Sequence, residues 1–163
     1  MISMDWIKYA PGKIIILDVL PAFGKTLCAA EYAQSDINDT IFFDNIMFVN
    51  DYHSIANYKN YLSRFNYLYR LHIDDIHKPK LHGSFCVQNM IIDDIYDSEL
   101  IIDIINKYHV QNKIIININR HRFNSGDYGK FITSLKSKFT NISHLYMPTK
   151  TIKAPEKKSG AED

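Results

Sequence analysis

The sequence predicts an α/β fold, a three-layer sandwich with a mainly parallel central sheet. Strand-like apolar runs alternate with helical patterns along most of the 163 residues. The run at 14–17 is continuously apolar, which favours a strand covered on both faces, and the run at 113–118 is likewise rich in β-branched residues. Strands that are separated by helices pair in parallel through right-handed crossovers, so the alternation predicts one sheet with helices on both sides.

The individual elements follow from local patterns. Apolar runs bounded by turn residues predict strands at 14–17, 40–43, 85–92, 113–118 and 142–147. Apolar residues at three- and four-residue spacing predict helices at 25–34, 52–71, 98–109 and 128–139. The segment 46–49 either extends the second strand or forms a separate one, and 72–84 is expected to be an irregular connection. At the start of the chain, Trp6, Ile7 and Tyr9 are expected to pack on the sheet edge.

The chain is expected to form a single domain over residues 1–148, followed by a disordered tail at 149–163. A length of 163 residues with 46% hydrophobic content is enough for one buried core. The tail contains almost no large apolar residue, a composition typical of disorder. The functional residues are therefore expected within the first 148 residues.

Composition limits the partners and the compartment. The formal charge of +1 excludes an overall basic surface for nucleic acid, although a local basic patch remains compatible with it. Cys28 and Cys86 stand alone, which fits neither a disulfide framework nor a zinc motif and favours a reducing compartment. No apolar run reaches the roughly 18 residues that span a bilayer, and the N-terminus lacks the pattern of a signal peptide. We expect a cytoplasmic protein without a membrane partner.

The segment KIIILDVLPAFGKT has the character of a phosphate-binding loop. A buried strand runs into a turn that carries Gly24, Lys25 and Thr26 at the start of a helix. This arrangement presents backbone N–H groups, an ammonium and a hydroxyl to a triphosphate and its magnesium ion. We expect Lys25 to reach the β- and γ-phosphates and Thr26 to ligate Mg²⁺. Val19 occupies the position where the pattern has its first glycine.

A second apolar strand, in VQNMIIDD, ends in Asp93 and Asp94. A carboxylate at such a strand end can hold a hydrated Mg²⁺ ion, and a following acid can orient the attacking water. We assign Asp93 to the metal and Asp94 to activation of water. The alternative is that Asp93, Asp94 and Asp97 cap the helix beginning near Ser98, because aspartate is favoured at that position.

The strand IIININR ends in polar residues that suit the same site. Asn117 and Asn119 lie on one face of an extended strand, and either could sense the γ-phosphate. Proximity to the strand end favours Asn119. Arg120 and Arg122 follow, and they suit either stabilisation of transition-state charge or contact with nucleic-acid phosphate; a solvated basic loop is the simpler alternative.

These motifs stand in an order that resembles the P-loop NTPase superfamily over residues 13–147, in the branch with an additional strand. That branch includes helicase ATPase domains, helicase loaders and viral packaging ATPases. The resemblance implies a three-layer α/β fold that binds ATP with Mg²⁺ and hydrolyses it by in-line attack of water. Its nucleotide-binding residues would be Pro21, Ala22, Phe23, Gly24, Lys25, Thr26 and Leu27. The chain departs from the family pattern at Val19, Ala22 and Asp94, where many relatives carry glycine, glycine and glutamate.

The resemblance implies an ATPase that couples hydrolysis to work on nucleic acid. The body shows no second domain of this type, so motor activity would need a homo-oligomer or a larger viral or replication complex. Frequent Ile, Asn, Lys, Tyr and Asp are typical of AT-rich genomes, such as those of many viruses, phages and some bacteria. If the protein is viral, its expected location is the host cytoplasm or the virion. Two alternatives stay open: a nucleotide or nucleoside kinase whose acceptor binds at 72–84, and a non-hydrolysing nucleotide-binding interaction module.

Overall fold

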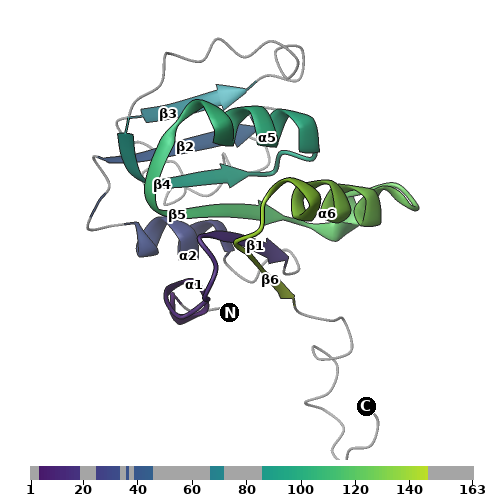
Figure 1. The fold of residues 1–163 in the computed structure, drawn as a ribbon, viewed down its shortest axis with the longest axis horizontal. Coiled ribbons are helices and arrows are strands. Elements are labelled where there is room, and N and C mark those ends of the chain that lie inside the picture. The colour runs from purple at the N-terminus through teal and green to yellow at the C-terminus, as the bar shows by residue number, and fades with distance from the viewer. Residues whose placement is uncertain are drawn as a thin grey trace, which may run out of the picture.

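A computed structural model describes residues 4–18, 25–33, 36, 39–45, 67–71 and 86–146. Its strands are β1 (Ile14–Asp18), β2 (Thr40–Asn45), β3 (Tyr67–Leu71), β4 (Cys86–Asp93), β5 (His109–Ile118) and β6 (Ile142–Tyr146). Its helices are α1 (Asp5–Lys8), α2 (Lys25–Tyr32), α5 (Ser98–Lys107), α6 (Asp127–Lys138) and the short 3₁₀ helix η4 (Arg120–Arg122). Figure 1 shows these elements as one α/β unit.

The described strands form one sheet in the order β3-β2-β4-β5-β1-β6, and every pairing in it is parallel. The fold class expected from the sequence is therefore confirmed. Strand β5 lies between β1, which precedes the glycine-containing loop, and β4, which ends in the acidic residues. This is the additional strand that the sequence resemblance implied.

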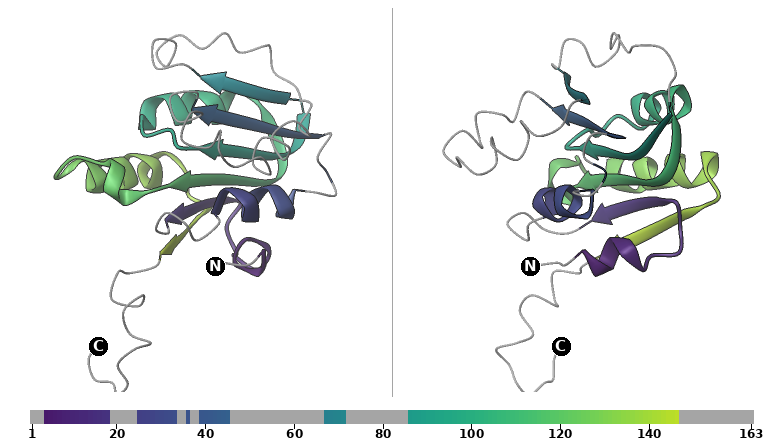
Figure 2. Two further views of the ribbon diagram at one scale, coloured as in Figure 1. Left: turned by 180° about the vertical axis from the view of Figure 1, so that it is seen from behind. Right: turned by 90° about the vertical axis from the view of Figure 1, so that its left-hand side faces the viewer.

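Helices cover both faces of the sheet (Figure 2). One core lies between the sheet and helices α5 and α6, and it includes Ile16, Ile92 and Ile116. The other lies on the α1 and α2 side and includes Leu17, Ile91 and Ile115. Neighbouring residues of each strand thus enter opposite cores, because successive side chains in a strand point to opposite faces. This burial on both faces explains the continuous apolar runs of β1 and β5.

Two local expectations are wrong. The helix expected over 52–71 does not extend to its end, because Tyr67–Leu71 forms strand β3 and pairs with β2. At the start of the chain, Tyr9 is 71% exposed and does not pack on the sheet. Ile7 and Trp6, both on the short helix α1, do pack in the α2-side core, which includes sheet residues and is contacted by Leu145 of the edge strand β6.

Several expectations lie outside the described residues, namely those for 46–49, 52–66, 72–84 and the tail at 149–163. The other strands and helices agree with the expected ones apart from small shifts at their ends, of which the largest is the earlier start of β5 at His109. None of the described helices is long and apolar enough to cross a membrane.

Candidate functional site at the carboxyl edge of the sheet

Polar side chains gather where the central strands end. Asp18 ends β1, Asp93 ends β4, and Asn117 is the penultimate residue of β5. Since the strands are parallel, these ends lie at one edge of the sheet, and Asp93 pairs in register with Asn117. All three residues are at most 1% exposed. In open α/β sheets this edge is where ligands bind.

The first cluster lies on the α2 face of the sheet. The Thr26 hydroxyl, in the first turn of α2, donates a hydrogen bond to Asp93 Oδ1 at 3.0 Å. The Asn117 amide Nδ2 donates to the same oxygen, also at 3.0 Å. The structure therefore joins the helix that follows the loop with the ends of β4 and β5. We call Thr26, Asp93 and Asn117 the α2-face cluster.

The α2-face cluster has the donor chemistry of a magnesium site. Its hydroxyl and carboxylate oxygens are hard ligands, the type that Mg²⁺ binds alongside phosphate oxygens and water. The Asn117 Oδ1 atom is buried and has no hydrogen-bond partner within the described part of the chain. A buried amide oxygen normally accepts a hydrogen bond, so Asn117 adds an unused oxygen acceptor to the cluster. Within those same ranges, no group of three or more His, Cys, Asp or Glu side chains forms a protein-only metal site.

Asp94 occupies a turn immediately after β4. Its φ of 56° lies in the left-handed region, which aspartate tolerates better than most residues. Its backbone N–H donates to the Asn117 carbonyl at 3.2 Å, and its Oδ1 accepts a hydrogen bond from the Tyr96 hydroxyl at 2.7 Å. The Asp94 side chain is thus held at the ends of β4 and β5 by a tyrosine that packs against the α5–α6 core.

Helix capping explains only one of the three acidic residues. Asp97 is the N-cap of α5, and its Oδ1 accepts hydrogen bonds from the backbone N–H groups of Glu99 and Leu100. Asp93 instead contacts Thr26 and Asn117, and Asp94 contacts Tyr96. Asp97 therefore caps the helix, whereas Asp93 and Asp94, the two acids assigned to metal and water, make other contacts.

Asn119 lies away from the α2-face cluster. It follows the end of β5, and its side chain caps η4 by accepting a hydrogen bond from the His121 N–H at 3.0 Å. Its own N–H donates to the Tyr96 hydroxyl at 3.0 Å. Of the two asparagines that the strand offers, Asn117 is the one whose side chain reaches Asp93, whereas the Asn119 side chain caps η4.

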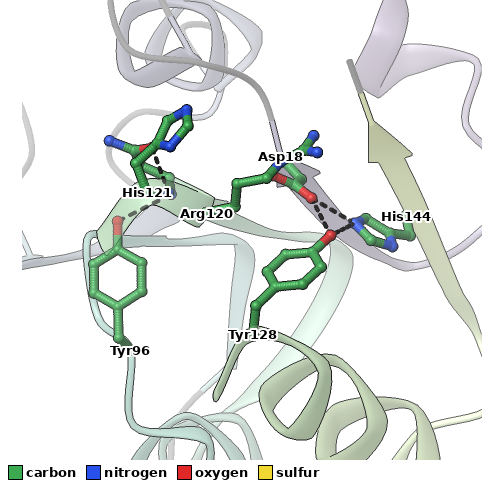
Figure 3. A network of polar contacts seen from close by, with 7 residues as sticks. Asp18, Tyr96, Arg120, His121, Tyr128 and His144 are labelled. Atoms are coloured by element: carbon green, nitrogen blue, oxygen red, sulfur yellow. Dashed lines mark hydrogen bonds and ion pairs between the residues drawn. The ribbon is translucent and has the colours of Figure 1, made fainter. Parts of the chain in front are cut away.

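A second cluster, on the α5–α6 face, surrounds Asp18. The Tyr128 hydroxyl donates to Asp18 Oδ2, and His144 Nε2 lies 3.0 Å from the same oxygen. Arg120 Nε lies 3.4 Å from Asp18 Oδ1. Figure 3 shows the Asp18, Tyr128 and His144 side chains pointing toward one another. We call Asp18, Arg120, Tyr128 and His144 the Asp18 cluster.

The Asp18 cluster keeps its carboxylate ionised. Burial alone would raise the pKa of Asp18, but the hydrogen bonds from His144 and Tyr128, together with the charge of Arg120, hold that pKa below its usual value. One sequence feature indicates this cluster: an acidic residue ends an otherwise apolar strand, and a buried charge needs partners. Sequence reasoning assigned no role to Asp18, Tyr128 or His144.

The remaining expected site residues are only partly described. Pro21, Ala22, Phe23 and Gly24 lie outside the described residues, as does Val19. Lys25 and Leu27 belong to α2, and the structure describes their backbone but not their side chains. Arg122 is exposed at the end of η4.

Arg122 also lines a surface cavity of about 310 Å³ between η4, the start of α5, and α6. Lys130 provides a second cation in its wall, Asp127 an acidic group, and Tyr96 an aromatic ring. Tyr96, which donates a hydrogen bond to Asp94, therefore forms part of the cavity wall.

No family model matches the sequence, and no curated protein sequence matches it significantly. Among solved structures, the fold is similar to the helicase domain of Hef from Pyrococcus furiosus, with a TM-score of 0.50 and 10% sequence identity. The match covers 91% of this chain and 38% of that chain, so this chain spans well under half the length of the helicase domain. At this identity the likeness concerns the fold alone, which is a helicase-like α/β fold.

Proposed function

We propose that the chain is a P-loop ATPase that binds ATP with Mg²⁺ and couples hydrolysis to work on nucleic acid. The observation that carries this proposal is the α2-face cluster, in which Thr26 and Asn117 both donate to Asp93 Oδ1. The loop-helix hydroxyl, the strand-end carboxylate and the neighbouring strand's amide meet where such an enzyme holds its nucleotide. The Hef helicase domain, with its similar fold, supports the same class.

In this proposal the loop and α2 bind the nucleotide. The backbone of Pro21, Ala22, Phe23 and Gly24, continuing into Lys25, Thr26 and Leu27, surrounds the phosphates at the positive end of α2. The Lys25 ammonium neutralises charge on the β- and γ-phosphates. Thr26 and Asp93 hold the Mg²⁺ ion, which when bound neutralises charge on the phosphate oxygens.

Asp94 and Asn117 act in the hydrolytic step. The water oxygen forms a bond to the γ-phosphorus while the bond between that phosphorus and the bridging oxygen of ADP breaks. Asp94 orients the water and accepts its proton, so that ADP and phosphate leave. Asn117 takes the γ-phosphate sensor role, because its amide reaches Asp93 whereas Asn119 caps η4.

The two arginines receive different roles. Arg120 forms an ion pair with Asp18, and only 20% of its side chain is exposed. It would have to leave this buried carboxylate to reach a phosphate, so we assign it to the stability of the Asp18 cluster rather than to catalysis. Arg122 is exposed and shares its cavity with Lys130, which suits contact with the phosphate backbone of nucleic acid.

The proposal is tested by measuring phosphate release from ATP with and without Mg²⁺, in the presence and absence of single- and double-stranded nucleic acid. We expect release that depends on Mg²⁺ and increases with nucleic acid. Formation of ADP only after a nucleoside or nucleotide acceptor is added would identify a kinase instead. Absence of ATP binding by calorimetry, with a folded spectrum, would leave only an interaction module.

The nucleic-acid contact is tested by replacing Arg122 and Lys130 with alanine together. Each phosphate contact contributes about 0.9 to the slope of log affinity against log salt, or about 0.7 for a single strand. We expect weaker nucleic-acid binding, a slope shallower by up to about 2, and unchanged turnover without nucleic acid. Lys136→Ala is the matched control, since Lys136 is exposed on α6 and does not line the cavity. Equal salt slopes for the wild type and the double variant would contradict this placement.

A further inference from the structure

Tyr96 connects two parts of the site that lie on different strands. Its hydroxyl donates to Asp94 Oδ1 at 2.7 Å and accepts the Asn119 N–H at 3.0 Å. Asp94 follows β4, whereas Asn119 lies between β5 and η4. Figure 3 shows the Tyr96 hydroxyl directed at the start of η4, on the side away from Asp18. One phenol group therefore uses both of its hydrogen-bonding functions at the strand ends.

The backbone of Asp94 fixes only part of the position of the Asp94 carboxylate. The orientation of the carboxylate therefore depends on a further hydrogen-bond partner. The left-handed turn and the bond from Asp94 N–H to the Asn117 carbonyl fix its Cα and Cβ atoms. These constraints do not prevent the carboxylate from rotating about the side-chain bonds of Asp94. The Tyr96 hydroxyl restrains this rotation by binding one carboxylate oxygen.

Tyr96 is itself held in place. Its ring packs edge-on against Phe123, with ring centroids 4.9 Å apart, and it contributes to the α5–α6 core. Burial, followed by the nearby charge of Asp94, raises the pKa of the Tyr96 hydroxyl far above its ordinary value. The hydroxyl therefore stays protonated and remains a donor at every pH at which the protein would work.

We propose that Tyr96 is a positioning residue for ATP hydrolysis: it fixes the Asp94 carboxylate in the orientation that activates water and ties it to the backbone of Asn119. This role rests on the proposed ATPase function. Tyr96 acts through Asp94, and it contacts neither nucleotide nor metal. Partners of this kind commonly contribute about 10- to 100-fold to activity.

The test compares Tyr96→Phe with Tyr128→Phe. Both tyrosines pack edge-on against Phe123, and both donate to a buried carboxylate at the same sheet edge. Tyr128, however, serves Asp18, which has no part in the proposed reaction. Single-turnover hydrolysis, calorimetric binding of a non-hydrolysable ATP analogue, and hydrogen exchange at the Asn119 amide are measured for the wild type and both variants.

For Tyr96→Phe we expect single-turnover hydrolysis to slow by about 10- to 100-fold, with analogue affinity within about twofold of the wild type. Exchange at the Asn119 amide should accelerate by about fivefold or more, because that amide loses its acceptor. Tyr128→Phe should change none of these three quantities. An unchanged rate in Tyr96→Phe, or an equal loss in both variants, would overturn the positioning role. A wild type without Mg²⁺-dependent turnover would instead refute the proposed function, and the role of Tyr96 with it.

Discussion

Replacing Asp93 with asparagine is expected to reduce Mg²⁺-dependent ATP turnover by about 100-fold or more. The change removes the negative charge that attracts the cation but keeps an oxygen that can accept the hydrogen bonds from Thr26 and Asn117. The free energy of unfolding should therefore fall by no more than about 1 kcal/mol. Phosphate release across a Mg²⁺ titration, together with urea unfolding, measures both effects.

Asp97→Asn is the matched control for Asp93→Asn. Asp97 lies four positions further along and caps α5, a role that asparagine fills equally well. Its turnover should equal that of the wild type. Lys25→Ala removes the proposed phosphate cation and should lose activity to a similar extent. Full activity in Asp93→Asn, or equal phosphate release by Lys25→Ala and the wild type, would remove the metal and phosphate roles from these residues.

Replacing Asp18 with asparagine is expected to destabilise the fold by about 2 to 4 kcal/mol. The carboxylate is 1% exposed, and the change leaves Arg120 without its buried counter-charge and weakens the contacts with Tyr128 and His144. The loss should lie toward the lower end of values for buried pairs, because 20% of the Arg120 side chain and 17% of the His144 side chain are exposed. Urea unfolding at neutral pH measures it, with Asp103→Asn on the exposed face of α5 as the control.

The pH dependence of that loss follows from the direction of the Asp18 pKa shift. The pKa in the folded protein lies below the ordinary value of 3.8, so the folded state favours the ionised carboxylate. Its contribution to stability is fully present well above pH 3.8 and is lost as the pH falls through the lowered folded value. The difference in unfolding free energy between the wild type and Asp18→Asn should shrink as the pH falls below about pH 4. A difference that stays the same down to about pH 2 would contradict the ion-pair account.

The sequence predicts the central strands well because their burial leaves a strong local signal. Every residue of Ile14–Asp18 is buried. Because helices cover both faces of the sheet, an alternation of apolar and polar residues would place polar side chains against the helices on one face. Tyr67–Leu71 shows where such reasoning fails. Its mixture of aromatic and apolar residues fits a helical spacing as well as a strand, and the deciding contact is its pairing with Ile41 and the rest of β2, distant in the chain.

In the same way, some contacts of the candidate site could be predicted from the sequence and others could not. Thr26 and Asp93 could be matched from sequence because one begins the helix after the first apolar strand and the other ends a later apolar strand, and parallel pairing then brings their elements to one edge. The choice between Asn117 and Asn119 depends on where β5 stops: it ends at Ile118, so Asn119 enters the cap of η4. Almost no sequence pattern indicates the Asp18 cluster, because His144 and Tyr128 are 126 and 110 residues away from Asp18 along the chain.

The central claim is that ATP and Mg²⁺ bind at the carboxyl edge of the sheet through the loop, α2 and the α2-face cluster. A crystal structure with a non-hydrolysable ATP analogue and Mg²⁺ tests it most directly. We expect the backbone amides between Val19 and Lys25 to surround the β-phosphate, with the Mg²⁺ ion bound by Thr26 and linked to Asp93. A nucleotide bound elsewhere, or an ion with no contact to Thr26 or Asp93, would contradict the claim.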